Sequence, residues 1–356
     1  MLTPSPSSPS SPIVHAAAVV PAASRRPTFY TLFVMLLLVG LALVPTYAAL
    51  SGQAFYVTLF ARIVVFAIAA VSLDLILGIG GLVSFGHALY LGLGAYAAGV
   101  LAQHGIDNGW VHLGVAIVLC GAVGFVTGFV SLRTTGIAFI MITLAFAQMV
   151  YFLAVSLKQY GGDDGLPLAA SSRFGNMSLG DPATLYYVAF GFLCLLLLFG
   201  SRFVKARFGM TLAGIRMNER RMKALGVPTL QYKLGAYVIA AILCGIAGVL
   251  YANLTQFVSP SYMSWTTSGE LIMMVVIGGI GTFVGPVVGA LAMVLVEEGL
   301  KSATEHWMFI MGPLIVLIVL LTRRGLMGVV HSADARRAAK IAAKIAARSK
   351  RTESLS

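Results

Sequence analysis

Long apolar runs separated by short polar segments repeat along most of the chain. A helix of about twenty apolar residues crosses the roughly 30 Å hydrocarbon core of a bilayer, and these runs lack the alternation typical of membrane strands. Spans are predicted at residues 28–50, 54–77, 82–103, 111–132, 137–157, 184–203, 234–255 and 308–321. The pattern predicts an all-α polytopic membrane bundle, because lipid cannot satisfy free backbone groups.

The apolar region 268–297 is too long for an ordinary single span. A break at Gly278, Gly279 and Gly281 gives a short inward piece and an outward piece, and predicts about ten membrane segments, two of them short or broken. The alternative is one crossing, which places the C-terminal tail on the opposite side of the membrane. The segment 158–182 contains glycines, prolines and acids and is expected to be a loop.

Basic residues indicate the orientation, because Lys and Arg near span ends stay in the cytoplasm. With Arg25 and Arg26 inside, six crossings return the chain to the inside at Arg202, and Arg133 also falls inside. The break in 268–297 then keeps the basic tail inside too. Both termini are therefore predicted to be cytoplasmic.

Three regions follow from this topology. Residues 1–27, rich in Ser, Pro and Ala, are predicted to be a disordered cytoplasmic extension. Residues 28–324 form the transmembrane domain, and 325–356 form a basic cytoplasmic tail. The tail is either a short helix on the inner membrane surface or unstructured. A cleaved signal peptide is the alternative for 28–50, which is long for such a segment.

Composition excludes several classes of protein. The chain is 59% hydrophobic and 10% charged, which is too apolar for a soluble domain of this length. The net charge of +12 is concentrated in the segment 201–233 and the tail, so it indicates topology and attraction to anionic membrane lipid, not nucleic acid. Cys120, Cys194 and Cys244 lie inside apolar runs without metal-site spacing. No metal or cofactor is expected.

Catalytic motifs are also missing from the sequence. It contains no paired catalytic carboxylates, no nucleophile elbow and no Gly-Lys dipeptide of a G-x-x-x-x-G-K-[ST] phosphate loop. The chain is therefore not predicted to be an enzyme.

The segment 201–233 is the one long polar, helix-forming insert between spans, with eight basic residues and a single acid, Glu219. A helix over 212–225 is predicted, ended by Gly226 and Pro228. Its apolar residues near one face are Leu212, Ile215, Met222 and Leu225. Such a helix, held by two spans, suits a partner's groove; the alternative is a helix lying on the membrane surface.

A glycine-rich motif occurs twice. Residues 79–86 (IGGLVSFG) resemble 277–285 (IGGIGTFVG), and both follow a predicted inward segment. Glycine-interrupted segments at matching positions point to a transport pathway between repeats, although glycine-rich membrane turns are also alike by chance.

Polar residues within spans are further candidates, because a buried charge is costly. His87 begins a helix, where a structural role is the alternative, and Gln148 lies mid-span, where an interhelical hydrogen bond is the alternative. Arg62 and Asp74 share one span but lie too far apart to pair. Each therefore needs another partner or a position at the membrane–water interface. The predicted pathway residues are Gly80, Gly81, His87, Gln148, Gly278 and Gly279.

Five stretches, in order, resemble one family. They are GIGGLVSFGHALYLGLGAYAAGVL (78–101), GIAFIMITLAFAQMVYFLAV (136–155), GGDDGLP (161–167), RFGMTLAGIRMNERRMKALGVPTLQYKLGAYVIAA (207–241) and VVIGGIGTFVGPVVGA (275–290). This is the LivH/LivM-type permease family, and specifically its LivM-type members, from ABC importers of branched-chain amino acids. The resemblance covers residues 28–324.

The resemblance implies a multi-pass subunit of the bacterial inner membrane. It implies a LivH-type permease partner, two cytoplasmic ATP-binding subunits and a periplasmic or extracellular substrate-binding protein. It also implies that the insert carries a coupling helix that docks on the ATPase. The coupling residues expected from it are Arg216, Glu219, Arg220, Ala224, Leu225 and Gly226. Arg220 and Arg221 replace the two alanines of the family's pattern.

The expected function is therefore translocation of branched-chain amino acids as the permease subunit of an ABC importer. The same type of permease for urea, short amides or other amino acids is one alternative. A stand-alone ion-coupled transporter is the other, and the lack of a well-placed pair of mid-membrane acids argues against it.

Overall fold

The computed structural model describes residues 29–175, 177–321 and 325–328. The predicted N-terminal extension and most of the basic tail lie outside these residues. Six helices in this part of the chain are long and apolar enough to cross a membrane. They belong to α1 (Phe29–Ser51), α2 (Ala54–Asp74), α4 (Gly109–Ser131), α5 (Ile137–Ser156), α6 (Pro182–Lys205) and α9 (Thr229–Thr255). The prediction of a helical membrane bundle is confirmed.

Shorter helices complete the bundle. They are α3 (Ala88–Gln103), α10 (Trp265–Gly278), α11 (Gly285–Ala303) and α12 (Trp307–Leu321). The predicted break in 268–297 is confirmed: α10 ends at Gly278, and Gly279 and Gly281 adopt positive φ angles of 121° and 81°. Glycine adopts such angles without steric cost, so these residues allow the chain to turn into α11.

The predicted start of the third span at residue 82 is wrong. A π-helical turn, η1 (Leu75–Ile79), extends α2, and the chain then runs without regular structure until α3 begins at Ala88. Gly81 has a φ of 70°, and Gly86 packs against the backbone carbonyl of Thr143. The positive φ of Gly81 and the contact of Gly86 with α5 are both incompatible with the long helix predicted from residue 82.

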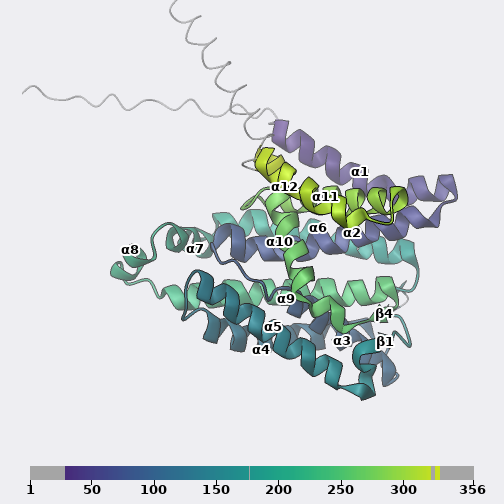
Figure 1. Ribbon diagram of the computed structural model, residues 1–356, viewed down its shortest axis with the longest axis horizontal. Coiled ribbons are helices and arrows are strands. Elements are labelled where there is room, and N and C mark those ends of the chain that lie inside the picture. Colours follow the sequence, from purple (N-terminus) through teal and green to yellow (C-terminus); the bar gives the residue numbers. More distant parts are fainter. Residues whose placement is uncertain (1–28, 176, 322–324, 329–356) are drawn as a thin grey trace, which may run out of the picture.

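Helix α9 lies at the centre of the bundle and packs against α2, α3 and α4. Glycines bring the backbones of α3 and α9 into contact: Gly94 faces the carbonyl of Gly245, and Gly248 faces the carbonyl of Leu91. Figure 1 shows α1, α11 and α12 on one side of the bundle and α4 and α5 on the other, with α9 between them.

The two ends of the bundle differ. At one end, α7 (Arg207–Met217) and α8 (Glu219–Ala224) project beyond the long helices (Figure 1). At the other end lies the predicted loop 158–182, which is confirmed as a loop with short elements. They are η2 (Lys158–Tyr160), η3 (Gly162–Asp164), β1 (Leu166–Pro167), β2 (Arg173–Phe174) and β3 (Met177–Ser178).

Two small antiparallel sheets close this second end. Strand β1 pairs with β4 (Phe257–Val258), with Leu166 opposite Val258, and β2 pairs with β3. A 3₁₀ turn, η4 (Pro260–Met263), then leads into α10. The loop is thus connected to the end of the central helix α9.

Candidate functional site: the basic end of the bundle

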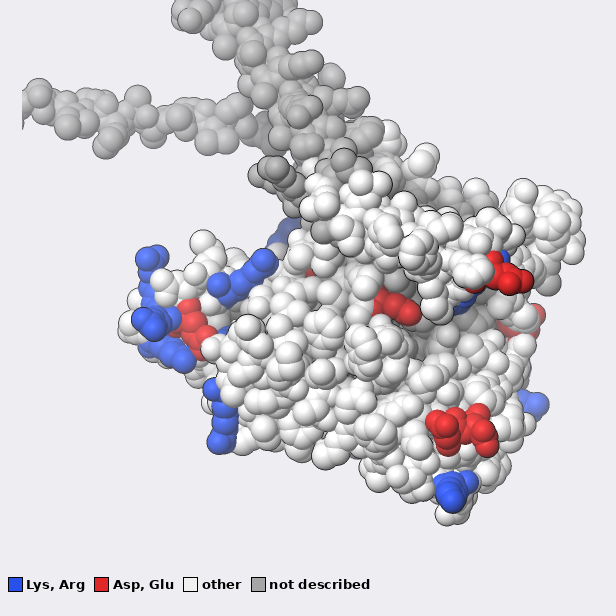
Figure 2. All heavy atoms as spheres, viewed as in Figure 1, with Lys and Arg blue, Asp and Glu red and all other residues white. Residues whose placement is uncertain are grey.

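Lys and Arg side chains gather over α7 and α8 on the face shown in Figure 2, whereas much of the surface between the two ends of the bundle is uncharged. The α4–α5 turn lies at the same end, because Thr134 and Gly136 line a cavity together with Arg216 and Glu219. We call the surface formed by α7, α8 and this turn the basic end.

The predicted single helix over 212–225 is wrong, because the chain forms two helices. Asn218 lies between them with an extended backbone, and its side-chain oxygen accepts a hydrogen bond from the Arg221 N–H at 3.0 Å. Asn favours this N-cap role over a helix interior. The break divides the expected apolar face: Leu212 and Ile215 are buried on the inner side of α7, whereas Leu225 is 71% exposed.

Glu219 fastens α8 to the first turn of α9. Its Oε2 accepts from Lys233 Nζ at 2.5 Å, and its Oε1 accepts from Lys223 Nζ at 3.0 Å and from Thr229 Oγ1 at 3.2 Å. Partial burial raises the pKa of Glu219, but the hydrogen bonds and charges of Lys233 and Lys223 outweigh it and hold the pKa below the ordinary 4.5. The carboxylate is therefore ionised at neutral pH.

Arg216 connects α7 to the end of α2. Its guanidinium donates to the carbonyl of Gly78 in η1, and a Cβ on Gly81 would lie 2.9 Å from Arg216 Cγ. A cavity of about 290 Å³ lies here, between the glycine segment after η1, the α4–α5 turn and the α7–α8 junction. The structure thus brings Gly80 and Gly81, predicted as pathway residues, together with Arg216 and Glu219, predicted as coupling residues.

Gly78, directly before the first glycine motif, contacts Gly281 of the second motif. A Cβ on Gly78 would lie 2.6 Å from the backbone nitrogen of Gly281, so only glycine fits at this crossing. The Gly281 N–H donates to Asp74 Oδ1 at 2.8 Å, while Asp74 Oδ2 is buried with no hydrogen-bond partner among the described residues. Asp74 is fully buried, so its position is in the core of the bundle and not at an interface with water.

The outer surface of α7 and α8 is both basic and apolar. Met210, Met217 and Leu225 are 58%, 87% and 71% exposed. Arg220, Ala224 and Gly226 are exposed as well. Gly226 ends α8 with a φ of 81°, as a helix C-terminus requires. Of the predicted coupling residues, Arg220, Ala224, Leu225 and Gly226 are exposed on this surface, whereas Glu219 points back toward α9 and the Arg216 guanidinium toward η1.

The predicted pathway residues do not form one site within this chain. His87 is buried, with Nε2 2.9 Å from Ser72 Oγ and Nδ1 without a partner in the described part of the chain. Gln148 is half-buried on α5, whereas Gly278 and Gly279 pack around the turn between α10 and α11. Gly80 and Gly81 pack against Ile76 and Arg216, and the two glycine regions are joined by Gly78 and Gly281 instead.

Sequence reasoning missed Lys233, Asn218 and the role of Asp74 as an acceptor. Lys233 follows Glu219 at a distance of 14 residues across a helix break, which no helical periodicity connects. The N-cap at Asn218 could have been predicted from the sequence, because Asn directly before an acidic first turn is typical of an N-cap.

Comparison with known proteins identifies the family. The branched-chain amino acid transport system permease component family matches residues 55–319. The chain belongs to this family. It is a multi-pass permease of the bacterial inner membrane and the non-catalytic membrane component of an ABC transporter. Members of this family work with ATPase subunits and a substrate-binding protein.

Several relatives of this permease carry names. It is 26% identical to the Escherichia coli high-affinity branched-chain amino acid transport system permease protein LivM over 74% of this chain and 68% of the relative. It is 26% identical to E. coli LivH over 74% of this chain and 91% of the relative. It is also 26% identical to the Azospirillum brasilense L-arabinose ABC transporter permease protein AraH over 59% of this chain and 63% of the relative. No solved structure matches the chain.

Proposed function

We propose that this permease carries branched-chain amino acids, and that α7 and α8 form the segment that docks on an ATPase subunit. In the complete importer it pairs with a LivH-type permease, two ATP-binding subunits and a binding protein that delivers the substrate. The observation that carries the coupling role is the exposed surface of α7 and α8, which is held to the bundle at two points.

Those two points give coupling a physical route. Glu219 connects α8 to the central helix α9 through Lys233, and Arg216 connects α7 to η1 through the Gly78 carbonyl. A displacement of the docked segment therefore acts on α9 and on the contact between Gly78 and Gly281. Transport cycles need such two-state rigid-body shifts.

The substrate assignment rests on the relatives, most of which are named for branched-chain amino acid transport. The likeness to AraH supports a pentose as the rival substrate. Uptake of L-leucine and L-arabinose is measured in cells that lack their own carriers and express the complete importer. L-leucine uptake is expected, and uptake of L-arabinose alone would overturn the assignment.

The coupling role is tested with Glu219→Lys and Gly226→Arg. The first variant places a third cation beside Lys233 and Lys223, and the second puts a long charged side chain at a φ of 81° on the docking surface. Both are expected to lower ATPase co-purification and L-leucine uptake at least tenfold, while the permease remains in the membrane.

Glu305→Lys is the matched control, since Glu305 is exposed and lies on the α11–α12 turn, away from α8. It is expected to bind the ATPase and to transport as the unmodified protein does. Normal co-purification and uptake in both α8 variants would contradict the docking assignment.

A further inference from the structure

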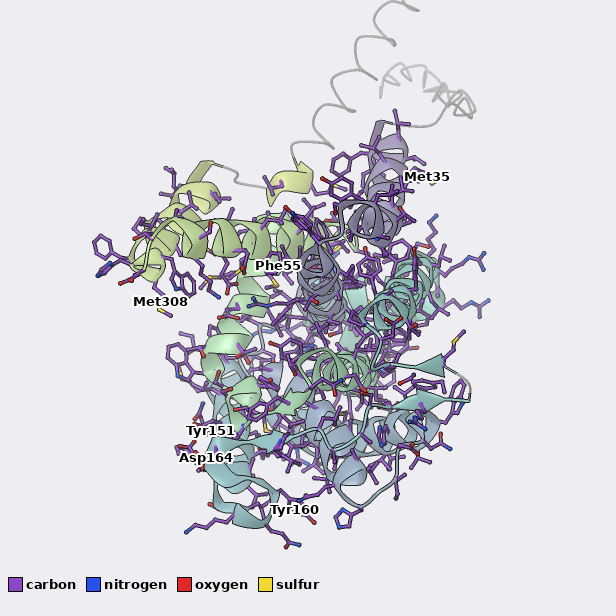
Figure 3. The ribbon with its side chains drawn as sticks, turned by 90° about the vertical axis from the view of Figure 1, so that its right-hand side faces the viewer. Met35, Phe55, Tyr151, Tyr160, Asp164 and Met308 are labelled. Atoms are coloured by element: carbon purple, nitrogen blue, oxygen red, sulfur yellow. The ribbon has the colours of Figure 1, made fainter. Side chains whose placement is uncertain are left out.

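A second cavity lies in the half of the bundle opposite α7 and α8. It has a volume of about 200 Å³ and is lined by α2, α9 and α11. This is below the roughly 300–1,000 Å³ typical of sites for drug-sized ligands, so it suits a small molecule. Phe55, which lines it, lies at the start of α2 near the middle of the end view in Figure 3.

One wall of this cavity carries charged side chains. Arg62 lines it about 12 Å along α2 from the helix start, at 1.5 Å per residue, and Glu298 of α11 lines it as well. Arg62 Nη2 donates to Glu297 Oε1 at 3.1 Å, and Lys301 Nζ donates to the same oxygen at 2.6 Å. The charge of Glu297 is thus matched by Lys301 even without Arg62.

Arg62 therefore has donor capacity beyond its ion pair. Its Nε–H is buried and has no hydrogen-bond partner among the described residues. A buried donor without a partner is unfavourable, and a ligand oxygen would supply one. Arg presents its donors as a planar fork that fits a carboxylate.

Carboxylates without an ion pair complete the arrangement. Neither Glu298 nor Glu270 of α10 forms an ion pair with a described residue, and Glu270 interacts electrostatically with Arg62, Glu297 and Lys301. Charges inside membrane segments are costly and mark substrate pathways more often than structure. The remaining wall is largely apolar and includes Leu59 and Leu254.

We propose that this cavity binds the zwitterionic head of an α-amino acid during translocation. The Arg62 guanidinium takes the substrate carboxylate, Glu298 takes the ammonium group, and the apolar wall takes the aliphatic side chain. The assignment rests on the proposed function. It adds a selective step within the permease, because a neutral sugar lacks both charges.

The test uses the complete importer in proteoliposomes, with its partner permease, ATPases and binding protein, and radiolabelled L-leucine. In Arg62→Gln, the maximal uptake rate is expected to fall at least tenfold with little change in KM, because the binding protein captures substrate from solution. Glu298→Gln is expected to lower the rate several-fold. Arg173→Gln, which removes an exposed ion pair with Asp107 at the same end, serves as the control and keeps the full rate.

Arg62→Lys separates binding from structure, because it keeps the charge beside Glu297 but loses the planar fork. Its rate is expected to stay at least threefold below that of the unmodified protein, with an unchanged melting temperature of the complex. A full rate in Arg62→Gln or Arg62→Lys overturns this inference alone. No L-leucine uptake by the unmodified importer overturns the proposed function instead.

Discussion

Glu219 is the residue on which the basic end depends most directly. Three groups donate to its two oxygens, and one of them, Lys233, is only 9% exposed in its side chain. Removing one partner of a buried pair leaves an uncompensated charge, which costs more than the pair contributes. The sequence pointed to Glu219 through its family pattern, but its partner became evident only once the break at Asn218 turned α8 back toward α9.

The Glu219 contact is expected to depend on pH. The pKa of Glu219 lies below 4.5 in the folded protein. The carboxylate therefore contributes its full stabilisation at pH values above its pKa in the unfolded chain, and this stabilisation is lost as the pH falls through its pKa in the folded protein. A spin label at Leu225→Cys, in a background without native cysteines, should keep a constant mobility from pH 7 to 5 and become more mobile below about pH 4.5.

Glu219→Gln provides the comparison for that experiment. Gln cannot carry the charge that holds Lys233, so the label should be mobile already at pH 7 and should respond weakly to acid. A label whose mobility changes with acid equally in both proteins would show that another group controls α8.

Glycines at the end of α2 and in the α10–α11 turn determine how these helices pack together. Gly78 of η1 and Gly281 of the α10–α11 turn meet at backbone distance, and Asp74 fixes the contact by accepting from the Gly281 N–H. Two segments more than 200 residues apart in sequence are thereby joined. The resemblance of residues 79–86 to residues 277–285 indicated a pathway, and the structure shows that Gly78, directly before the first motif, touches Gly281 of the second.

Gly78→Ala is expected to lower uptake at least tenfold. The added methyl would lie 2.6 Å from the Gly281 nitrogen, and overpacking of this kind typically costs about 1–3 kcal/mol. Gly269→Ala in α10 is the control, because its methyl would meet nothing within 4 Å. Transport assays on membranes with equal permease content distinguish the two. Equal uptake would mean that the contact between the turns is not needed.

Element boundaries show what apolar patterning can predict. Six long helices and the break near Gly278 follow from hydrophobic length and from glycine. The start of α3 was misplaced by six residues, because residues 82–87 are apolar enough for a span, while the contact of Gly86 with the Thr143 carbonyl of α5 carries no signal in the sequence. The insert was misassigned as one helix because a local cap at Asn218 outweighed its helical periodicity. Tertiary and capping contacts of this kind carry no periodic signal.

The orientation of the whole molecule is still a prediction, based on the basic end and the acidic loop opposite. Met217 and Asp164 are exposed at these two ends. Figure 3 faces the end opposite α7 and α8 of Figure 1 and labels Asp164. In a background without Cys120, Cys194 and Cys244, a membrane-impermeant thiol reagent should label Asp164→Cys in spheroplasts. It should label Met217→Cys only in inside-out vesicles. The reverse pattern would invert the topology.

The cavity beside Arg62 and the basic end lie in opposite halves of the bundle, and sequence foresaw neither arrangement fully. Arg62 and Asp74 were predicted to need separate partners, which is confirmed by Glu297 and Gly281. The identity of those partners depends on how α10 and α11 fold back against α2. That arrangement is determined by contacts between residues far apart in the sequence.

The glycine contacts of the core determine where movement is possible. The backbones of α3 and α9 touch at Gly94 and Gly248, and those of α10 and α11 touch at Gly289, so neither pair has space to slide. Helix α2 packs against both α9 and α11. A cycle driven from α8 should therefore shift one pair as a block relative to the other along α2, the helix that carries Arg62 toward one end and Asp74 at the other.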